Sequence, residues 1–177
     1  MKKKIIIIIA AAVVIAAAIL AGMKLFNTSK LNKGVLKSAR WGYGGGMTGG
    51  HSSVEIRLEG DKAILVTEEQ EWHNSDLTKV TYTLPADVMD KLKDLIIDAD
   101  VPTLSKRGMS DIFAYDAATY SFSCYFEGVD YYSVSQNQKK SGAEADKLYA
   151  IRTYLYSLAQ QNEGVTEIIK GTAREDN

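Results

Sequence analysis

The sequence has little of several residue types on which common kinds of protein depend. It holds a single cysteine, Cys124, so we expect neither a disulfide framework nor a cysteine-based zinc site. Cys124 alternates in phase with Phe122 and Phe126, which predicts a buried structural thiol. Setting aside three N-terminal lysines leaves 18 of the 21 basic residues against 22 acidic ones, a net charge of −4. Because nucleic-acid binding needs a basic surface, we expect no nucleic-acid partner.

Phosphate-binding signatures are also missing. The chain has no Gly-Lys-Ser or Gly-Lys-Thr, which excludes a P-loop. Gly44, Gly46 and Gly49 match the spacing of a dinucleotide fingerprint, but a strand follows them instead of the helix that the motif requires. We therefore expect no cofactor. Six glycines within residues 42–50 predict either a flexible hairpin or an exposed loop that contacts a ligand or partner.

Histidine is scarce as well, since His51 and His73 are the only two. Together with Asp76, Asp111 or Asp116 they would form a two-histidine, one-carboxylate metal site. Their spacing matches no known ligand signature, and the segment around His73 is equally typical of a polar hairpin turn. We assign no metal and no catalytic residue from the sequence.

A long apolar run is what the sequence does have. Lys2, Lys3 and Lys4 precede nineteen residues, Ile5 to Met23, that carry no charge and no hydrogen-bonding side chain. At about 1.5 Å per residue a helix of this length reaches roughly 28 Å, close to the thickness of a bilayer core. It exceeds the roughly 7–15 apolar residues of a cleaved secretory signal. We therefore predict an uncleaved signal-anchor at residues 5–23, after a cytoplasmic tail at residues 1–4.

The end of this run indicates the compartment. Leu20-Ala21-Gly22 matches the first three positions of a bacterial lipobox, but Met23 replaces the lipidated cysteine. This match indicates a bacterial cell-envelope protein, although such an apolar triplet also arises by chance. The short basic tail before the anchor favours an extracytoplasmic domain, whereas basic residues after the anchor favour the opposite orientation. We expect the domain outside the cell membrane.

The remainder predicts one domain of the α+β class. We expect a linker at residues 24–34, a single ectodomain at 35–170 and a disordered tail at 171–177. Period-two alternation predicts strands near residues 35–43, 54–58, 62–69, 80–84, 117–126 and 129–135, with a hairpin turn at Gly60-Asp61. Together they predict an antiparallel sheet of about six strands.

Two helices complete this prediction. Pro85 is expected in the first turn of a helix that ends before Pro102, and Ser141 with Glu144 forms a capping box that opens the second helix. The expected order is ββββαββα, with both helices backing the sheet. Residues 105–111 are expected to form a polar loop.

The candidate contact residues come from the segments whose composition a packed core does not explain. They are the glycine-rich loop, the two histidines and an aromatic residue in a turn. The set also includes Arg107 and Asp111, which would either form an ion pair with each other or bind an anionic partner. The set is Gly44, Gly45, Gly46, His51, Trp72, His73, Arg107 and Asp111.

The layout also resembles known bacterial families. A glycine-rich early segment, an acidic helix, the segment from Asp116 to Phe122 and a closing helix resemble small membrane-anchored, lipoprotein-like domains. The same order is similar to the emfourin-like inhibitors of thermolysin-type peptidases, over roughly residues 35–160. This resemblance implies a peptidase inhibitor. The anchor and the insertions around Trp72 and Arg107 depart from that family, so no inhibitory residue is transferred.

The sequence therefore predicts a membrane-anchored, non-enzymatic binding domain that contacts a protein or cell-envelope ligand. A metal-dependent hydrolase using His51, His73 and an aspartate is one alternative. A structural accessory subunit of a membrane complex is the other.

Overall fold

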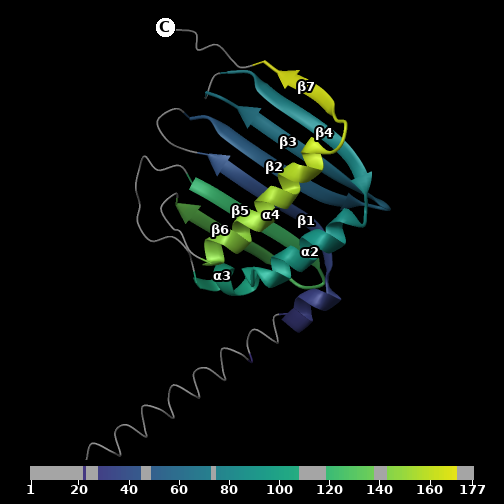
Figure 1. Cartoon of the computed structure of the whole chain (residues 1–177), viewed down its shortest axis with the longest axis vertical. Coiled ribbons are helices and arrows are strands. Elements are labelled where there is room, and N and C mark those ends of the chain that lie inside the picture. The colour runs from purple at the N-terminus through teal and green to yellow at the C-terminus, as the bar shows by residue number, and fades with distance from the viewer. Residues whose placement is uncertain are drawn as a thin grey trace, which may run out of the picture.

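The computed structural model describes residue 22 and residues 28–44, 49–72, 75–107, 119–137 and 143–170 of the chain. Figure 1 shows a single sheet with helices packed across it. The elements follow in chain order: β1 (Val35–Gly44), β2 (His51–Glu59), β3 (Lys62–Gln70), β4 (Leu77–Pro85), α2 (Val88–Asp98), α3 (Val101–Arg107), β5 (Thr119–Glu127), β6 (Tyr131–Asn137), α4 (Ala143–Gln160) and β7 (Val165–Ile169).

The sheet has seven strands in the order β6-β5-β1-β2-β3-β4-β7, and every neighbouring pair is antiparallel. The predicted α+β class with an antiparallel sheet is confirmed. The expected count of about six strands omitted β7, and the expected order omitted both α3 and β7.

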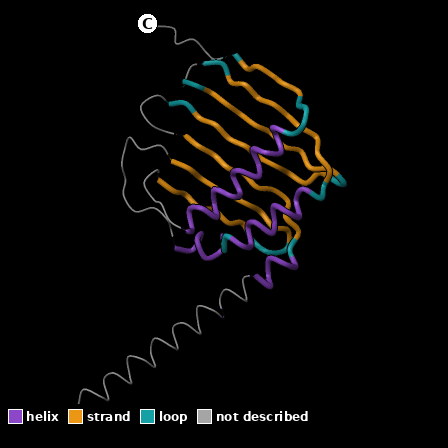
Figure 2. The backbone as a smooth tube through the Cα atoms, viewed as in Figure 1, coloured by secondary structure: helices purple, strands orange, loops and turns teal. Residues whose placement is uncertain are grey.

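The helices cover one face of the sheet. Figure 2 shows α4 running diagonally across the strands, with α2 beside it. Side chains that alternate inward from the strands meet the apolar sides of these helices, because successive residues of a strand point to opposite faces. Trp41, Ile56, Leu65 and Phe122 from the sheet are buried in this core, as is Leu155 from α4.

The two ends of the sheet carry different connections. We call the end where β1 begins the proximal end; β2 runs into it and turns at Gly60-Asp61 into β3, and β5 runs into it before β6. We call the opposite end the distal end. Gly44 at the end of β1 pairs with both His51 at the start of β2 and Thr119 at the start of β5, so these three residues lie at the distal end. His51 pairs with Gln70, so the connection between β3 and β4 lies there as well.

Of the two proline predictions, the one for Pro85 is wrong and the one for Pro102 is confirmed. Pro85 closes β4 opposite Lys62 instead of opening a helix, and α2 begins at Val88. Strand β7 pairs only with Leu77 to Thr81 of β4, so the missing N–H of Pro85 interrupts no pairing with β7. Helix α2 does end before Pro102, but α3 begins at Val101 with this proline in its first turn. The expected polar loop therefore begins as helix, because residues 105–107 lie in α3.

The segment before β1 belongs to the folded domain. Residues 28–33, expected within a linker, form a short helix that we call the leading helix, and its Leu31 is 1 % exposed. Apart from Gly22, the predicted signal-anchor lies outside the described residues, as do Ser141 of the capping box and the tail at 171–177. Among the described residues, no helix has the length and apolar character needed to cross a membrane.

The edges of the sheet also differ. At the β6 edge the backbone N–H of Ser133 donates to the hydroxyl of Ser105 on α3, at 3.2 Å, so this helix satisfies part of the edge. At the other edge all five residues of β7 are exposed, including Val165 at 77 %. Strand β7 is thus held by its pairing with β4 and contributes no buried residue to the core.

Candidate functional site

Strand register brings several candidate residues to the distal end. Gly44 pairs with His51 across β1 and β2, and His51 pairs with Gln70 across β2 and β3. The connection that follows Gln70 contains Trp72 and leads to Leu77 at the start of β4. The glycine-rich segment and the segment around Trp72, which lie far apart in the sequence, are therefore attached to neighbouring strands at one end of the sheet.

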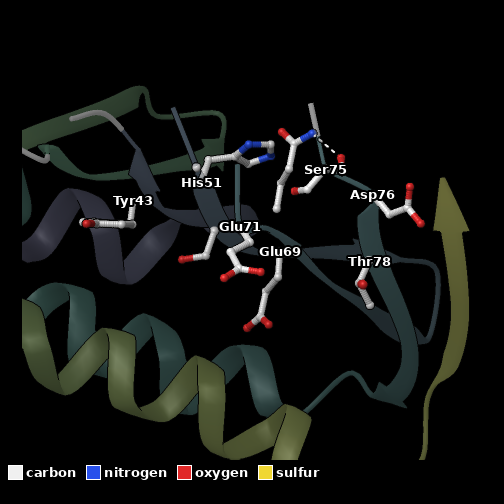
Figure 3. A pocket seen from close by; sticks show the side chains of 10 residues that line it. Tyr43, His51, Glu69, Glu71, Ser75, Asp76 and Thr78 are labelled. Atoms are coloured by element: carbon white, nitrogen blue, oxygen red, sulfur yellow. Dashed lines mark hydrogen bonds between the residues drawn. The ribbon is translucent and has the colours of Figure 1, made fainter. Parts of the chain in front are cut away.

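A hollow of about 740 Å³ lies at this end, between the ends of β2, β3 and β4. Figure 3 shows the side chains around it. The residues that line it are polar or aromatic and include three carboxylates; they are Tyr43, Gly50, His51, Ser52, Glu69, Gln70, Glu71, Ser75, Asp76 and Thr78.

The side chains of the hollow come from both faces of the sheet. Glu69 lies opposite Ser52 and Thr78 and points to the helix-covered side, whereas His51 lies on the other side of the strands (Figure 3). The amide of Gln70 donates to the carbonyl of Ser75 at 2.9 Å, which holds the β3–β4 connection against the end of β3. Asp76 pairs with Lys170 at 2.7 Å, and the carboxylates of Glu69 and Glu71 make the hollow favourable for a basic or hydrogen-bond-donating ligand group.

Trp72 stands in a turn closed by one serine. The backbone N–H of Trp72 donates to the hydroxyl of Ser75, and that hydroxyl donates to the carbonyl of Trp72, both at 2.9 Å. The indole is nevertheless 52 % exposed. The hydrogen bonds between Trp72 and Ser75 agree with the polar turn that is one of the two interpretations of this segment, and Trp72 is exposed next to Glu71, which lines the hollow.

An aromatic cluster lies on the helix-covered side of the same end. The rings of Tyr43 and Tyr120 are 5.0 Å apart between centroids, and Trp41 lies 6.2 Å from both Tyr120 and Tyr149. The Nε1 of Trp41 is buried without a hydrogen-bond partner among the described residues. Tyr43 belongs to both the cluster and the hollow, so the two form a continuous aromatic and polar region.

Other predicted contact residues are not placed by the structure. Gly45, Gly46, His73 and Asp111 lie outside the described residues, as does Asp116 of the metal hypothesis. Arg107 is the last residue of α3, and its side chain is not described. In the described ranges, no group of three or more histidine, cysteine, aspartate or glutamate residues has the arrangement of a metal site. The two-histidine metal site stays an untested hypothesis.

Sequence reasoning missed Glu69 and Glu71 of the hollow, and it named Asp76 only as a candidate metal ligand beside the two histidines. Glu69 is the next-to-last residue of β3, and Glu71 and Asp76 flank the turn that follows, so their spacing resembles that of solvated charges around any hairpin. Only the register of β2, β3 and β4 brings them beside His51 and Tyr43. No local pattern in the sequence contains that information.

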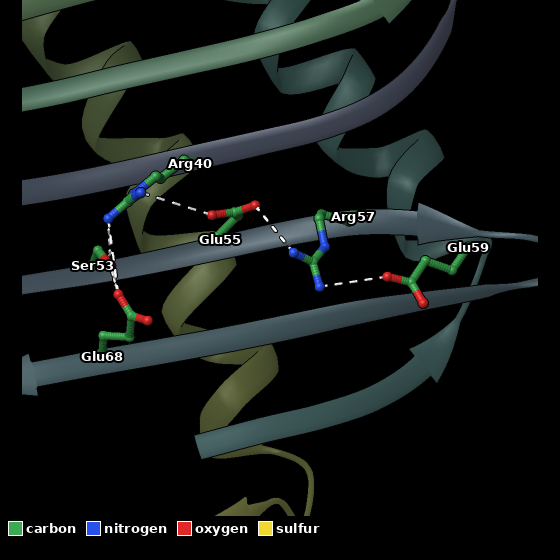
Figure 4. Close-up of polar contacts among 6 residues, drawn as sticks. All are labelled: Arg40, Ser53, Glu55, Arg57, Glu59 and Glu68. Atoms are coloured by element: carbon green, nitrogen blue, oxygen red, sulfur yellow. Dashed lines mark hydrogen bonds and ion pairs between the residues drawn. The ribbon is translucent and has the colours of Figure 1, made fainter. Parts of the chain in front are cut away.

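The face of the sheet opposite the helices carries a ladder of charged side chains (Figure 4). Arg40 on β1 donates to the hydroxyl of Ser53, at 3.3 Å, and that hydroxyl donates to Glu68 on β3, also at 3.3 Å. Arg57 lies between Glu55 and Glu59, at 3.8 and 3.5 Å. The contacts of Arg40, Ser53 and Glu68 link β1, β2 and β3, whereas the pairs of Arg57 run along β2; both sets keep this face polar, which is a structural role.

The single thiol is not part of any reactive site. Cys124 is 1 % exposed on the helix-covered side of β5, as predicted. Burial raises its pKa from 9.0 to about 12, so it stays protonated at neutral pH. A protonated, inaccessible thiol is neither a nucleophile nor a metal ligand.

Comparison of the chain with protein-family models, with curated proteins and with solved structures gave no match.

Proposed function

We propose that this chain is a membrane-anchored, extracytoplasmic binding domain whose distal end contacts a protein or cell-envelope ligand. The observation that carries the proposal is the gathering of exposed Trp72, His51 and the acidic hollow at the end of the sheet opposite the leading helix. A chain tethered at its N-terminus presents this far end to partners. Connecting loops on a rigid sheet are a common location for binding residues.

The chemistry of the distal end indicates the kind of partner. Exposed tryptophan and tyrosine are enriched at protein interfaces, and Trp72 has its turn fixed before binding, which lowers the entropy cost of ordering it. Glu69 and Glu71 favour a partner that presents lysine, arginine or an amine, whereas Asp76 already pairs with Lys170 at 2.7 Å. The resemblance to peptidase inhibitors makes an envelope peptidase one specific form of this proposal.

The two ends of β3 provide a matched test of the binding surface. A photo-crosslinking amino acid replaces Trp72 at the distal end in one variant and Asp61, in the proximal turn, in the other; both positions are exposed. In intact cells that produce the full chain, we expect a discrete adduct from position 72 and none from position 61. Equal adducts from both positions, or none from position 72, would contradict a distal binding surface.

The compartment is tested separately by cysteine labelling. Because Cys124 is buried, Asp61→Cys and Trp72→Cys each introduce the single accessible thiol. A membrane-impermeant maleimide is expected to label both variants in intact cells. Labelling that requires the membrane to be opened first would show that the domain is cytoplasmic and would overturn the extracytoplasmic assignment.

A further inference from the structure

The leading helix is fixed to the domain by three kinds of contact. Leu31 is buried in the core. The ammonium group of Lys93 on α2 donates to the carbonyls of Asn32 and Gly34, at 2.9 and 2.8 Å. Lys30 forms an ion pair with Asp130, in the connection between β5 and β6, at 2.8 Å. The chain from residue 28 onward therefore moves with the sheet.

Little chain remains between this helix and the predicted anchor. The anchor is expected to end at residue 23, which leaves residues 24–27 before the leading helix begins. Even fully extended, this stretch reaches only about 17 Å at roughly 3.4 Å per residue. A nine-residue strand is itself about 30 Å long. If the anchor spans a membrane, the proximal end of the sheet lies close to the membrane surface.

The proximal end carries a group of exposed apolar and aromatic side chains. Tyr125 and Tyr131 lie directly opposite each other on β5 and β6, on the face that the helices leave uncovered. Val35, at the start of β1, pairs with Glu127, two residues beyond Tyr125 on the same strand. All three are exposed, with Tyr131 at 64 %. We call Val35, Tyr125 and Tyr131 the proximal patch.

The charges around the proximal patch are balanced. Glu127 pairs with Lys37 at 2.8 Å, and Asp130 pairs with Lys30. Lys33 on the leading helix is a further exposed cation. Because Glu127 and Asp130 are both paired and Lys33 adds a positive charge, these residues give the surroundings of the patch no net negative charge that anionic lipid would repel. Tyrosine rings are also enriched at the membrane–water interface, where the ring meets apolar atoms and the hydroxyl meets water.

We propose that the proximal patch rests in the interface of the bilayer into which the chain is anchored, so that the domain stands on the membrane with its distal end outward. This inference rests on the membrane anchoring of the proposed function. The occupant of the patch is a lipid surface, because the short tether brings lipid within reach of every copy of the chain, whatever other protein is present.

The test uses the full chain in vesicles of phosphatidylcholine that contain lipid with a nitroxide quencher near the headgroup. Tyr131→Cys carries a bimane fluorophore, and Ser135→Cys carries the same label on the same strand and face, about 13 Å closer to the distal end. Val35→Cys is a second patch position that keeps both tyrosines. Cys124 stays in place in every variant, because its burial protects it from the label.

We expect quenching by the lipid nitroxide to be several-fold stronger at positions 131 and 35 than at position 135, and quenching by aqueous iodide to show the reverse order. Equal, weak lipid quenching at all three positions, in chain that floats with the vesicles, would overturn this inference and leave the anchor intact. Shielding of position 131 from iodide without lipid quenching would mean that protein, such as a second copy, covers the patch; this also overturns it. Failure of the chain to float would remove the anchor and this inference together.

Discussion

The two ends of the sheet are built from the same strands but differ in how they are closed. At the proximal end two residues separate β2 from β3 and three separate β5 from β6, and Gly60 and Gly128 take the positive φ angles that such tight turns need. At the distal end six residues separate β1 from β2 and six separate β3 from β4. Longer connections cost more entropy to order and carry function more often. We therefore expect the proximal end to contribute more to stability and the distal end to carry the protein or envelope contacts of the proposed function.

The largest expected difference is between Leu31→Ala and Trp72→Ala. Leu31 is 1 % exposed and attaches the leading helix, so its truncation leaves a cavity and costs about 2–5 kcal/mol of unfolding free energy. Trp72 is exposed, and its turn is held by backbone contacts with Ser75, so we expect a cost within about 0.5 kcal/mol. Urea denaturation of both variants measures the difference. A cost for Trp72→Ala equal to that for Leu31→Ala would show that the indole supports the fold.

Gly34 at the proximal end and Gly44 at the distal end allow the two ends to be compared by adding a methyl group to each. A Cβ at Gly34 would lie 2.6 Å from a methyl of Val129 and 3.3 Å from Phe126. Gly34→Ala therefore forces the leading helix and the β5–β6 connection apart, and we expect a loss of about 1–3 kcal/mol. A Cβ at Gly44 would meet His51 at an ordinary 3.7 Å. Gly44→Ala is expected to leave thermal stability nearly unchanged.

Gly44→Ala is expected to affect partner binding without affecting the stability of the domain. If the glycine-rich segment serves partner contact, Gly44→Ala reduces the crosslinking yield from position 72 while the melting temperature stays the same. A fall in the melting temperature equal to that of Gly34→Ala would mean that the glycine has a structural role.

The buried thiol reports on the region between the two ends. The pKa of Cys124 is about 12 in the fold and near 9.0 in an exposed thiol, so between these values the unfolded chain binds fewer protons than the folded chain. Stability therefore falls as pH rises, by about 1.4 kcal/mol from pH 7 to pH 10 for this group. Denaturation at both pH values, with Cys124→Ala as the control that lacks this contribution, measures it.

The same thiol tests whether the distal end opens alone. If the long connections of the distal end open without global unfolding of the domain, a maleimide is still expected to react with Cys124 only at the rate of global unfolding, because this thiol is buried in the core. A reaction much faster than global unfolding would show that opening at one end exposes the centre of β5, against the separation of the two ends.

Much of the fold follows from local patterns. The alternation Val54, Ile56, Leu58 is that of a strand with one buried face, and the structure has it in β2. Strand β7 has no such alternation: its sequence Val-Thr-Glu-Ile-Ile is rich in β-branched residues but sets apart no buried face, and in the structure all five residues are exposed. Pro85 misled for a related reason: a proline suits the first turn of a helix, as Pro102 does in α3, and only tertiary pairing decides that Pro85 closes a strand.

The candidate site was less predictable than the fold. His51 and Trp72 stood out by rarity and by their position in turns, and the structure places both at the distal end. Glu69 and Glu71 did not stand out, because acidic residues near turns are common, and their position beside His51 and Tyr43 depends on strand register. The proximal patch was equally hidden, since Tyr125 and Tyr131 become neighbours only through the pairing of β5 with β6.

The smallest expected effects come from two exposed ion pairs, one at each end. Lys37 pairs with Glu127 at the proximal end, at 2.8 Å, and Lys170 pairs with Asp76 at the distal end, at 2.7 Å. Solvent screens both, so Lys37→Gln and Lys170→Gln are each expected to cost no more than about 0.5 kcal/mol. Raising the salt to about 1 M, where the screening length is about 3 Å, should remove the difference from the unsubstituted chain.

The location of the response should nevertheless differ between these two variants. Strand β7 buries no side chain, so Lys170→Gln should raise amide hydrogen exchange in β7 alone. Lys37 lies within β1, which pairs on both sides, so Lys37→Gln should leave exchange in every strand unchanged. A global loss of protection in Lys170→Gln would mean that β7 supports the whole sheet, and the assignment of stability to the proximal end would fail.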